Sequence, residues 1–515
     1  MRAALIAALL FAAACEGSSE RPNIQIGNTL LKGLSVATPS VEAFLGVPYA
    51  QPPVGELRWS PPKSQTPSAP RTIDASAFAN ACMQGSHQTD WYHGVIEDFG
   101  GDPAVFPAPS VSEDCLYLNI WRPAQVTESP QPTIVFVHGG SHTAGWSFEP
   151  NYHGEALAAQ GMVIVSVGYR LGPFGYLSHP EMRAANLALE DVIAALQWLH
   201  THSSALGVDS TRITLMGESA GADLIAHLLA APQAKGMFQR VIHQSAGWSA
   251  SGALPQQHRE ELAVALQNAV GAADVEALRN TSAEEVLRAS ESVFADAGYG
   301  PVVDGRVLTA SLASLIGSAQ LRAVDLLIGS NADEWLMYLG SDEAVLEELR
   351  TLAVSSGAGE IAIPEAADAQ RALLNRVISA RDFHCPSMLM ARQNTVAGGS
   401  SWVYYFSKVR PGEKAVSIGA YHGAELPYAF DTHDDWLPTD DSDRTLTAQV
   451  MAYWVNFARY GNPNGTGFPA WPRFNDDELV LDLGSELAVA THPAAALCRR
   501  GDSTSPTISA ETSGS

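Results

Sequence analysis

Short apolar runs alternate along this chain with segments of helical periodicity. The runs lie at 133–137, 162–167, 212–216, 324–328 and 402–406. Uninterrupted apolar runs of this length, rich in β-branched residues, are typical of strands buried on both faces. Residues 186–200 carry apolar positions at helical spacing, and 256–292 are rich in Ala, Glu and Leu. The alternation predicts an α/β fold whose mostly parallel central sheet is covered by helices on both faces.

The ends of the chain differ from this pattern. Residues 22–500 contain no internal repeat and no linker, so we expect a single domain there. Residues 501–515 are rich in Ser, Thr, Gly and Pro, a composition that predicts a disordered tail. At the other end, Arg2 precedes an apolar stretch of small residues that stops at Cys15. Such a stretch is too short to span a bilayer and predicts an export signal over residues 1–15.

Cys15 bears on whether the exported protein is anchored to a membrane or released. Its position after small residues resembles the lipobox of bacterial lipoproteins, although Ala12 stands where a leucine is usual. The alternative is an ordinary secretory signal that is cut near Ala14. The sequence therefore predicts a secreted, periplasmic or lipid-anchored protein, with lipidation of Cys15 as the one expected membrane attachment.

The formal charge excludes one class of partner. With 30 Lys and Arg against 55 Asp and Glu, the net charge is −25, whereas nucleic-acid binding requires a basic surface. An excess of acidic residues keeps a protein surface solvated and the protein soluble, which is our interpretation here. The alternative is that the negative charge steers cationic substrates toward the protein. The chain shows no Cys/His cluster typical of zinc sites, and we expect neither a metal nor an organic cofactor. Nothing in the sequence indicates the oligomeric state.

The strongest chemical motif is Gly217-Glu218-Ser219-Ala220-Gly221. It follows the apolar run at 212–216 and precedes a segment of helical pattern. A serine at such a strand–turn–helix junction is presented as a nucleophile, and the flanking glycines allow the sharp bend. Chance matches to five residues occur in chains of this composition, but the context favours a serine hydrolase with Ser219 as its nucleophile.

Several motifs in order along the chain resemble the type-B carboxylesterase family. They are FLGVPYAQPPVGELRW at 44–59, EDCLYLNIWRP at 113–123, GYRLG at 168–172, GESAG at 217–221, YHGAELPY at 421–428 and YWVNFA at 453–458. The resemblance extends over about residues 24–498. It implies the α/β-hydrolase fold and the cleavage of small-molecule carboxylic esters through an acyl-enzyme. A bacterial member is expected from the style of the export signal.

The resemblance also assigns a catalytic triad. A serine hydroxyl requires a neighbouring base, and a carboxylate must orient that base. The motif at 421–428 implies His422 as the general base and acid. The family pattern places the orienting acid at Glu334, after the apolar run at 324–328, and the carboxylates Asp333 and Asp304 are its rivals. The chain order Ser, acid, His is that of α/β hydrolases.

An oxyanion hole is implied at His138-Gly139-Gly140-Ser141. Its donors would be the backbone N–H groups of Gly140, Ser141 and Ala220. Ser141 replaces the third glycine that the family usually has, and it keeps its N–H group. Two further departures, Gly168 and the segment 206–208, are interpreted as packing differences.

Four cysteines remain after Cys15, and they allow three disulfide pairings. We favour Cys82–Cys115 and Cys385–Cys498. The segment between Cys82 and Cys115 is expected to form a long loop over the active site, with Trp91 and Tyr92 at its mouth. Packing within the loop is the alternative for both aromatic side chains.

By resemblance, two buried ion pairs are expected, and Ser245 is expected to hydrogen-bond near the acid. The pairs are Arg58 with Glu113 and Arg170 with Asp191.

Specificity is expected to be that of a general carboxylesterase. Small residues at 295–298 precede Pro301 where cholinesterases have bulky aromatics, which implies a roomier acyl pocket. Cholinesterase-like or lipase-like specificity are the alternatives within the enzyme class. A non-catalytic adhesion or binding module of the same fold is the alternative outside it.

Overall fold

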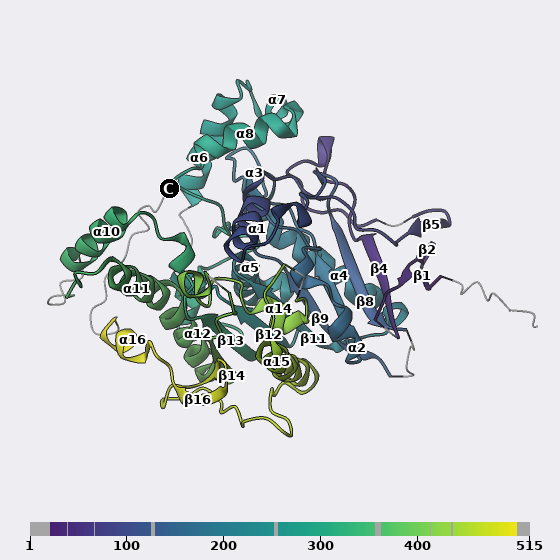
Figure 1. Cartoon of the computed structure of the whole chain (residues 1–515). Helices are drawn as coiled ribbons and strands as arrows, with labels where there is room; N and C mark the ends of the chain where they lie inside the picture. Colours follow the sequence, from purple (N-terminus) through teal and green to yellow (C-terminus); the bar gives the residue numbers. More distant parts are fainter. Residues whose placement is uncertain are drawn as a thin grey trace, which may run out of the picture.

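An eleven-stranded sheet forms the centre of the computed structural model, which describes residues 21–501 except 39, 66, 125–128, 252–255, 356–361, 413 and 434–435. Its strand order is β16-β15-β14-β13-β12-β11-β9-β10-β8-β4-β3 (Figure 1). The strands from β15 to β10 are parallel, and antiparallel strands close both edges. The predicted mostly parallel sheet is confirmed.

The sheet strands include all five predicted runs. Their bounds are β3 Leu34–Ser35, β4 Val41–Pro48, β8 Tyr117–Pro123, β9 Gln131–Val137, β10 Val163–Val167, β11 Val208–Glu218, β12 Arg240–Gln244, β13 Asp325–Asn331, β14 Ser400–Phe406, β15 Leu479–Leu483 and β16 Leu487–Thr491. Smaller sheets are formed by β1 Asn23–Ile26, β2 Thr29–Lys32 and β5 Arg71–Asp74, and by β6 Ala81–Cys82 and β7 Val111–Ser112.

Alternate residues of each central strand enter different hydrophobic cores. In β9, Val135 and Val137 belong to the core shared with α4, α5 and α12, whereas Ile134 and Phe136 belong to the core shared with α2, α14 and α15. Successive strand side chains point to opposite faces, so both faces of a central parallel strand must be apolar. This is why the runs lack polar alternation.

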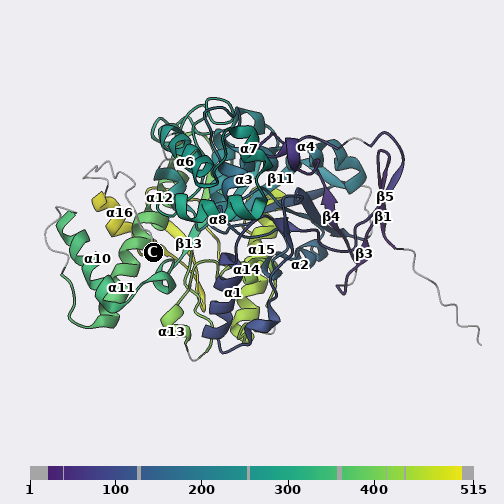
Figure 2. The same cartoon turned by 90° about the horizontal axis from the view of Figure 1, so that it is seen from above.

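The helices have the following bounds: α1 His87–Asp98, α2 Glu155–Ala159, α3 Gly172–Tyr176, α4 Leu187–Leu206, α5 Ala220–Ala230, α6 Gln256–Ala269, α7 Val275–Asn280, α8 Ala283–Val293, α9 Leu312–Gly317, α10 Asp342–Ser355, α11 Ala367–Ile378, α12 Cys385–Val396, α13 Ala415–Ile418, α14 Leu426–Phe430, α15 Asp441–Tyr460 and α16 Ala495–Gly501. In both views, α10 and α11 lie at the end of the molecule opposite β1 and β5 (Figures 1 and 2).

The predicted and observed helices differ in where they begin and end, and the residues at those ends explain the differences. The helix expected at 186–200 continues as α4 to Leu206 and ends where Gly207 adopts the left-handed φ of 76°, which glycine tolerates best. The segment 256–292 contains three helices, because the side chains of Asp274 and Ser282 each accept a backbone N–H and begin a new helix.

Two disulfides join the expected pairs, Cys82–Cys115 and Cys385–Cys498. They are compatible with an exported protein. In the described part of the chain, no helix combines the length and apolarity needed to cross a membrane. The expected export signal at 1–15, with Cys15, lies outside the described residues. Of the expected tail at 501–515, Gly501 is the last residue of α16, and the rest lies outside the described residues.

Candidate active site

Ser219 lies in a strained turn between β11 and α5. Its φ of 54° and ψ of −131° are unusual for a residue with a side chain, and such a conformation costs on the order of 1–3 kcal/mol. Its N–H donates to the Gln244 carbonyl at 2.9 Å, and its carbonyl accepts the Asp223 N–H at 3.0 Å. Strand β12 and the first turn of α5 therefore hold the backbone of Ser219 in place.

The two glycines of the motif allow a close approach of backbones. A Cβ atom on Gly221 would lie 2.0 Å from the carbonyl oxygen of Val137, at the end of β9. A Cβ on Gly217 would lie 2.7 Å from the carbonyl carbon of Gly221. No side chain can be accommodated at these distances, so α5 can begin directly against β9 only because both positions are glycine.

His422 and Glu334 reach the same edge of the sheet from two other strands. Glu334 follows β13, and His422 lies in the segment that connects β14 to α14. The Nδ1 atom of His422 is 2.6 Å from Oε2 of Glu334, whose other oxygen accepts the Asn331 N–H at 2.7 Å. The carboxyl ends of neighbouring parallel strands meet at one edge, which brings residues so far apart in sequence together.

The rival carboxylates are occupied elsewhere. Asp333 accepts the Ala420 N–H at 2.9 Å and the Asn375 amide at 2.9 Å. One oxygen of Asp304 accepts three backbone N–H groups, from residues 306, 307 and 308. Both carboxylates stabilise loop backbone, and neither has a described contact with His422.

The other ring nitrogen of His422 faces the turn that carries Ser219. Nε2 lies 3.2 Å from Oε1 of Glu218, the residue directly before Ser219. Among the described hydrogen bonds, none joins His422 to Ser219 itself. Catalytic hydrogen bonds are often long without substrate and tighten when it binds, and the imidazole already lies beside the turn that carries the hydroxyl.

The loop after β9 is folded against Ser219. A Cβ on Gly139 would lie 2.9 Å from Cβ of Ser219. Gly140 has φ 102°, and its carbonyl accepts the N–H groups of Thr143 and Ala144 at 3.0 and 2.9 Å. Ser141 is exposed and has φ 55°. The donors expected at Gly140 and Ser141 thus belong to a tight loop beside Ser219, and Ala220 is the first residue of α5.

Aromatic side chains surround the imidazole. The ring centroids of Phe383, Trp248 and Tyr338 lie 5.6, 6.3 and 6.4 Å from that of His422. The indole N–H of Trp91 donates to the Tyr338 hydroxyl at 3.0 Å. These contacts place Trp91 among the residues next to the candidate site.

Several sequence expectations near the site are corrected. The expected loop between Cys82 and Cys115 contains the helix α1, and Tyr92 on that helix is buried, with its hydroxyl bonded to Glu149 at 2.7 Å. Tyr92 is therefore a packing residue, because its polar end has a partner inside the protein. The Ser245 hydroxyl is buried and has no hydrogen-bond partner among the described residues, so the expected bond near the acid is absent.

The expected ion pairs are formed. Arg170 and Asp191 contact at 2.6 Å and are almost completely buried, and Arg58 contacts Glu113 at 2.5 Å.

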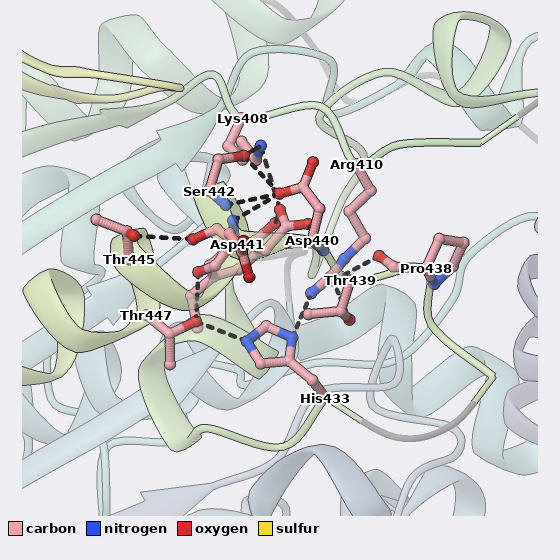
Figure 3. Close-up of polar contacts among 12 residues, drawn as sticks. Lys408, Arg410, His433, Pro438, Thr439, Asp440, Asp441, Ser442, Thr445 and Thr447 are labelled. Carbon is pink, nitrogen blue, oxygen red and sulfur yellow. Dashed lines mark hydrogen bonds and ion pairs between the residues drawn. The ribbon is translucent and has the colours of Figure 1, made fainter.

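Polar side chains gather at the start of α15, where residues that follow β14 meet the first turn of the helix (Figure 3). Lys408, after β14, contacts Asp443 at 3.3 Å, and Asp443 accepts the Tyr428 hydroxyl of α14 at 2.6 Å. The Arg410 guanidinium lies 4.6 Å from the Tyr428 ring centroid and bonds to His433 at 3.1 Å. These contacts tie α14, which begins four residues after His422, to β14 and α15.

Comparison with known proteins identifies the family of the chain. The model of the carboxylesterase family matches residues 20–500. The chain belongs to this carboxylesterase family.

Two curated bacterial relatives are similar over most of the chain. Fumonisin B1 esterase of Sphingopyxis macrogoltabida is 31% identical over 478 residues, covering 87% of this chain and 84% of that protein. Para-nitrobenzyl esterase of Bacillus subtilis (strain 168) is 31% identical over 485 residues, covering 88% and 93%.

Solved structures support the fold. Two structures of PNB esterase superpose with TM-scores of 0.76 and 0.77 at 27% identity, covering 93% of this chain and 99% of theirs. The expected α/β-hydrolase fold is confirmed, and this carboxylesterase is a carboxylic ester hydrolase.

Buried carboxylates control the protonation of His422 in this carboxylesterase. Burial by itself would lower the pKa of His422, but the neighbouring Glu218 and Glu334 carboxylates outweigh it and raise the pKa to about 9. Burial raises the pKa of Glu218 to about 8 and that of Glu425 to about 7. The arrangement favours a positively charged imidazole, which is the form a general base takes after it accepts a proton.

Sequence reasoning missed the polar residues around Glu334 and His422 in this carboxylesterase. The Asn331 side chain donates to Glu425 at 2.6 Å, and Gln244 donates to the other oxygen of Glu425 at 2.9 Å. Glu218 stood inside the quoted motif, but nothing in a linear pattern showed that its carboxylate faces His422. Within the described ranges, no three His, Cys, Asp or Glu side chains gather closely enough to hold a metal ion.

Proposed function

We propose that this carboxylesterase cleaves carboxylic esters by two-step acyl transfer, with Ser219 as nucleophile, His422 as general base and acid, and Glu334 as the orienting acid. The observation that supports this best is the position of His422. One ring nitrogen is held by the buried Glu334 at 2.6 Å, and the other faces the turn of Ser219.

In the first step, the Ser219 hydroxyl attacks the ester carbonyl carbon while Nε2 of His422 takes its proton. The carbonyl oxygen becomes an oxyanion and accepts N–H groups from Gly140, Ser141 and Ala220. Each such donor contributes roughly 3–4 kcal/mol to transition-state stabilisation. The proton on His422 then passes to the departing alkoxide, and the alcohol leaves behind an acyl-enzyme.

In the second step, water attacks the acyl carbon while His422 takes a proton from it. The same N–H groups hold the second oxyanion. When it collapses, the bond to the serine oxygen breaks, His422 returns a proton to that oxygen, and the carboxylic acid is released. Glu334 fixes the ring so that Nδ1 carries hydrogen and stabilises the imidazolium in both steps.

For the substrate, we propose esters of uncharged short and medium acyl groups. Small residues occupy 295–298, and the neighbouring aromatic rings of Phe294 and Tyr299 stack on each other with centroids 4.5 Å apart. Para-nitrobenzyl and para-nitrophenyl esters are suitable first probes, since one relative is named for the former. Acetylcholine turned over far better than these esters would favour a cholinesterase, and activation at an oil–water interface would favour a lipase.

The test is a pair of variants assayed with para-nitrophenyl butyrate. Ser219→Ala is expected to reduce kcat by on the order of 10⁶, and Glu334→Gln by on the order of 10³–10⁴, because the second retains the nucleophile but loses the orienting charge. Asp333→Asn is the matched control, since that carboxylate adjoins Glu334 without touching His422. Hydrolysis that survives Ser219→Ala would overturn the mechanism and leave the binding-module alternative.

A further inference from the structure

A second imidazole–carboxylate pair joins the loop after β9 to α5, the helix that begins directly after Ser219. Nε2 of His142 is 3.1 Å from Oδ2 of Asp223, and both side chains are more than nine-tenths buried. His142 directly follows Ser141 in the loop after β9, and Asp223 lies one helical turn beyond Ser219 on α5. The pair therefore connects the two elements that carry the expected oxyanion donors.

The backbone of this loop is strained. Ser141 and His142 are consecutive residues with φ of 55° and 63°, and each left-handed residue with a side chain costs roughly 1–2 kcal/mol. Such a conformation persists only where surrounding contacts enforce it. The ring of His142 supplies two of these contacts, because its Nδ1 is also 2.8 Å from the Tyr176 hydroxyl. The His142 carbonyl accepts the Gly172 N–H at 2.7 Å.

No second polar contact between this loop and α5 is present in the described part of the chain. Among the described hydrogen bonds and ion pairs, the contact between His142 and Asp223 is the one that joins residues 138–145 to α5. The other polar contacts of the loop are internal or lead to α3, Tyr169 and Gln84. A tetrahedral oxyanion requires donors 2.7–3.1 Å away, so the loop and the start of α5 must keep a fixed separation.

Asp223 is suited to this task because it stays ionised. Burial would raise its pKa, but His227 and His142 together hold the pKa well below the usual range. His227, one turn further along α5, contacts the other oxygen of Asp223 at 3.5 Å. It has no described contact with the loop.

We propose that His142 and Asp223 are positioning residues that set the distance between the two halves of the oxyanion hole. The proposal rests on the acyl-transfer function above. It assigns to these residues no proton transfer and no contact with substrate. Loss of the link would let the Ser141 N–H move away from the oxyanion while Ser219, His422 and Glu334 stay in place.

The experiment compares His142→Phe, Asp223→Asn and the double variant with wild type, and His258→Gln, at an exposed histidine of α6, is the control. A misplacement of about 1 Å can cost about 100-fold, so each single variant is expected to lower kcat by about 10- to 100-fold with KM changed less than about threefold. The double variant should be no slower than the worse single variant, because both remove one link. His258→Gln should retain kcat.

A transition-state analogue separates positioning from a general structural role. A trifluoromethyl ketone forms a hemiketal oxyanion on the serine, so its Ki should rise in each variant by the same factor by which kcat/KM falls. Circular dichroism and urea unfolding confirm that each variant is folded. His142→Gln, whose amide can still donate to Asp223, should recover part of kcat and of the inhibitor affinity.

Two results would overturn the proposal. One is an unchanged kcat in folded His142→Phe and Asp223→Asn. The other is a lower kcat with unchanged inhibitor affinity. Failure of the proposed function is distinguishable, because it would appear as activity in Ser219→Ala, whereas an inactive Ser219→Ala with fully active Asp223→Asn refutes the positioning role alone.

Discussion

Replacing Glu218 by Gln tests how the candidate site sets the protonation of His422. The substitution keeps the shape of the side chain but removes the carboxylate 3.2 Å from Nε2. That carboxylate favours the charged imidazole, so its removal lowers the pKa of His422 from about 9. In the proposed mechanism His422 acts as a base only when its imidazole is neutral. The acid limb of the kcat/KM profile, where activity falls as pH decreases, should therefore move to lower pH.

The magnitude follows from the separation. Unit charges at 3.2 Å interact by about 1.3 kcal/mol in water and about 5 kcal/mol at a dielectric constant of 20. Since one pH unit corresponds to about 1.4 kcal/mol, the limb should move by at least about one unit. Burial raises the pKa of Glu218 to about 8, so part of this carboxyl is protonated and uncharged in the pH range of the assay. The acid limb is therefore expected to move by a value near the lower figure of about one unit.

The assay is kcat/KM for para-nitrophenyl butyrate between pH 5 and 10, in buffers of constant ionic strength and with subtraction of spontaneous hydrolysis. Glu348→Gln, an exposed carboxyl on α10, is the matched control and should leave the profile unchanged. An acid limb that stays in place in Glu218→Gln, or that moves to higher pH, would refute the electrostatic reasoning.

Three further predictions concern stability and folding. Gly221→Ala should give insoluble or inactive protein, because its Cβ would lie 2.0 Å from the Val137 carbonyl oxygen, and soluble expression with a hydrolysis assay checks this. Asp191→Asn leaves the buried Arg170 without its charge partner and should lower the free energy of unfolding by about 3–5 kcal/mol in urea titrations. Cys498→Ser opens a disulfide that spans 113 residues and should cost about 4–5 kcal/mol on the loop-entropy model, measured under non-reducing conditions.

Local patterns predicted β9, β10, β11, β13 and β14, because burial on both faces leaves apolar runs, but they missed β12, whose sequence RVIHQ contains polar residues. The run at 133–137 became β9 with two core faces, and the helix ending at Gly207 differed from expectation only in length. Tyr92 shows the limit of such reasoning. Its sequence neighbours suggested a loop over the site, but its hydroxyl is bonded to Glu149, 57 residues away.

The sequence by itself indicated five strands of the central sheet in their order along the chain, the sharp turn at Ser219 and, through resemblance, the candidates Glu334 and His422. These features depend on apolar spacing, on glycines that admit close backbones and on motifs of a few adjacent residues. Only the tertiary structure decided that Glu218 faces His422, that Asn331 links Glu334 to Glu425, and that Asp223 holds His142. The reason is that parallel strands gather their carboxyl ends at one edge of the sheet, where side chains separated by scores of residues meet at hydrogen-bond distance.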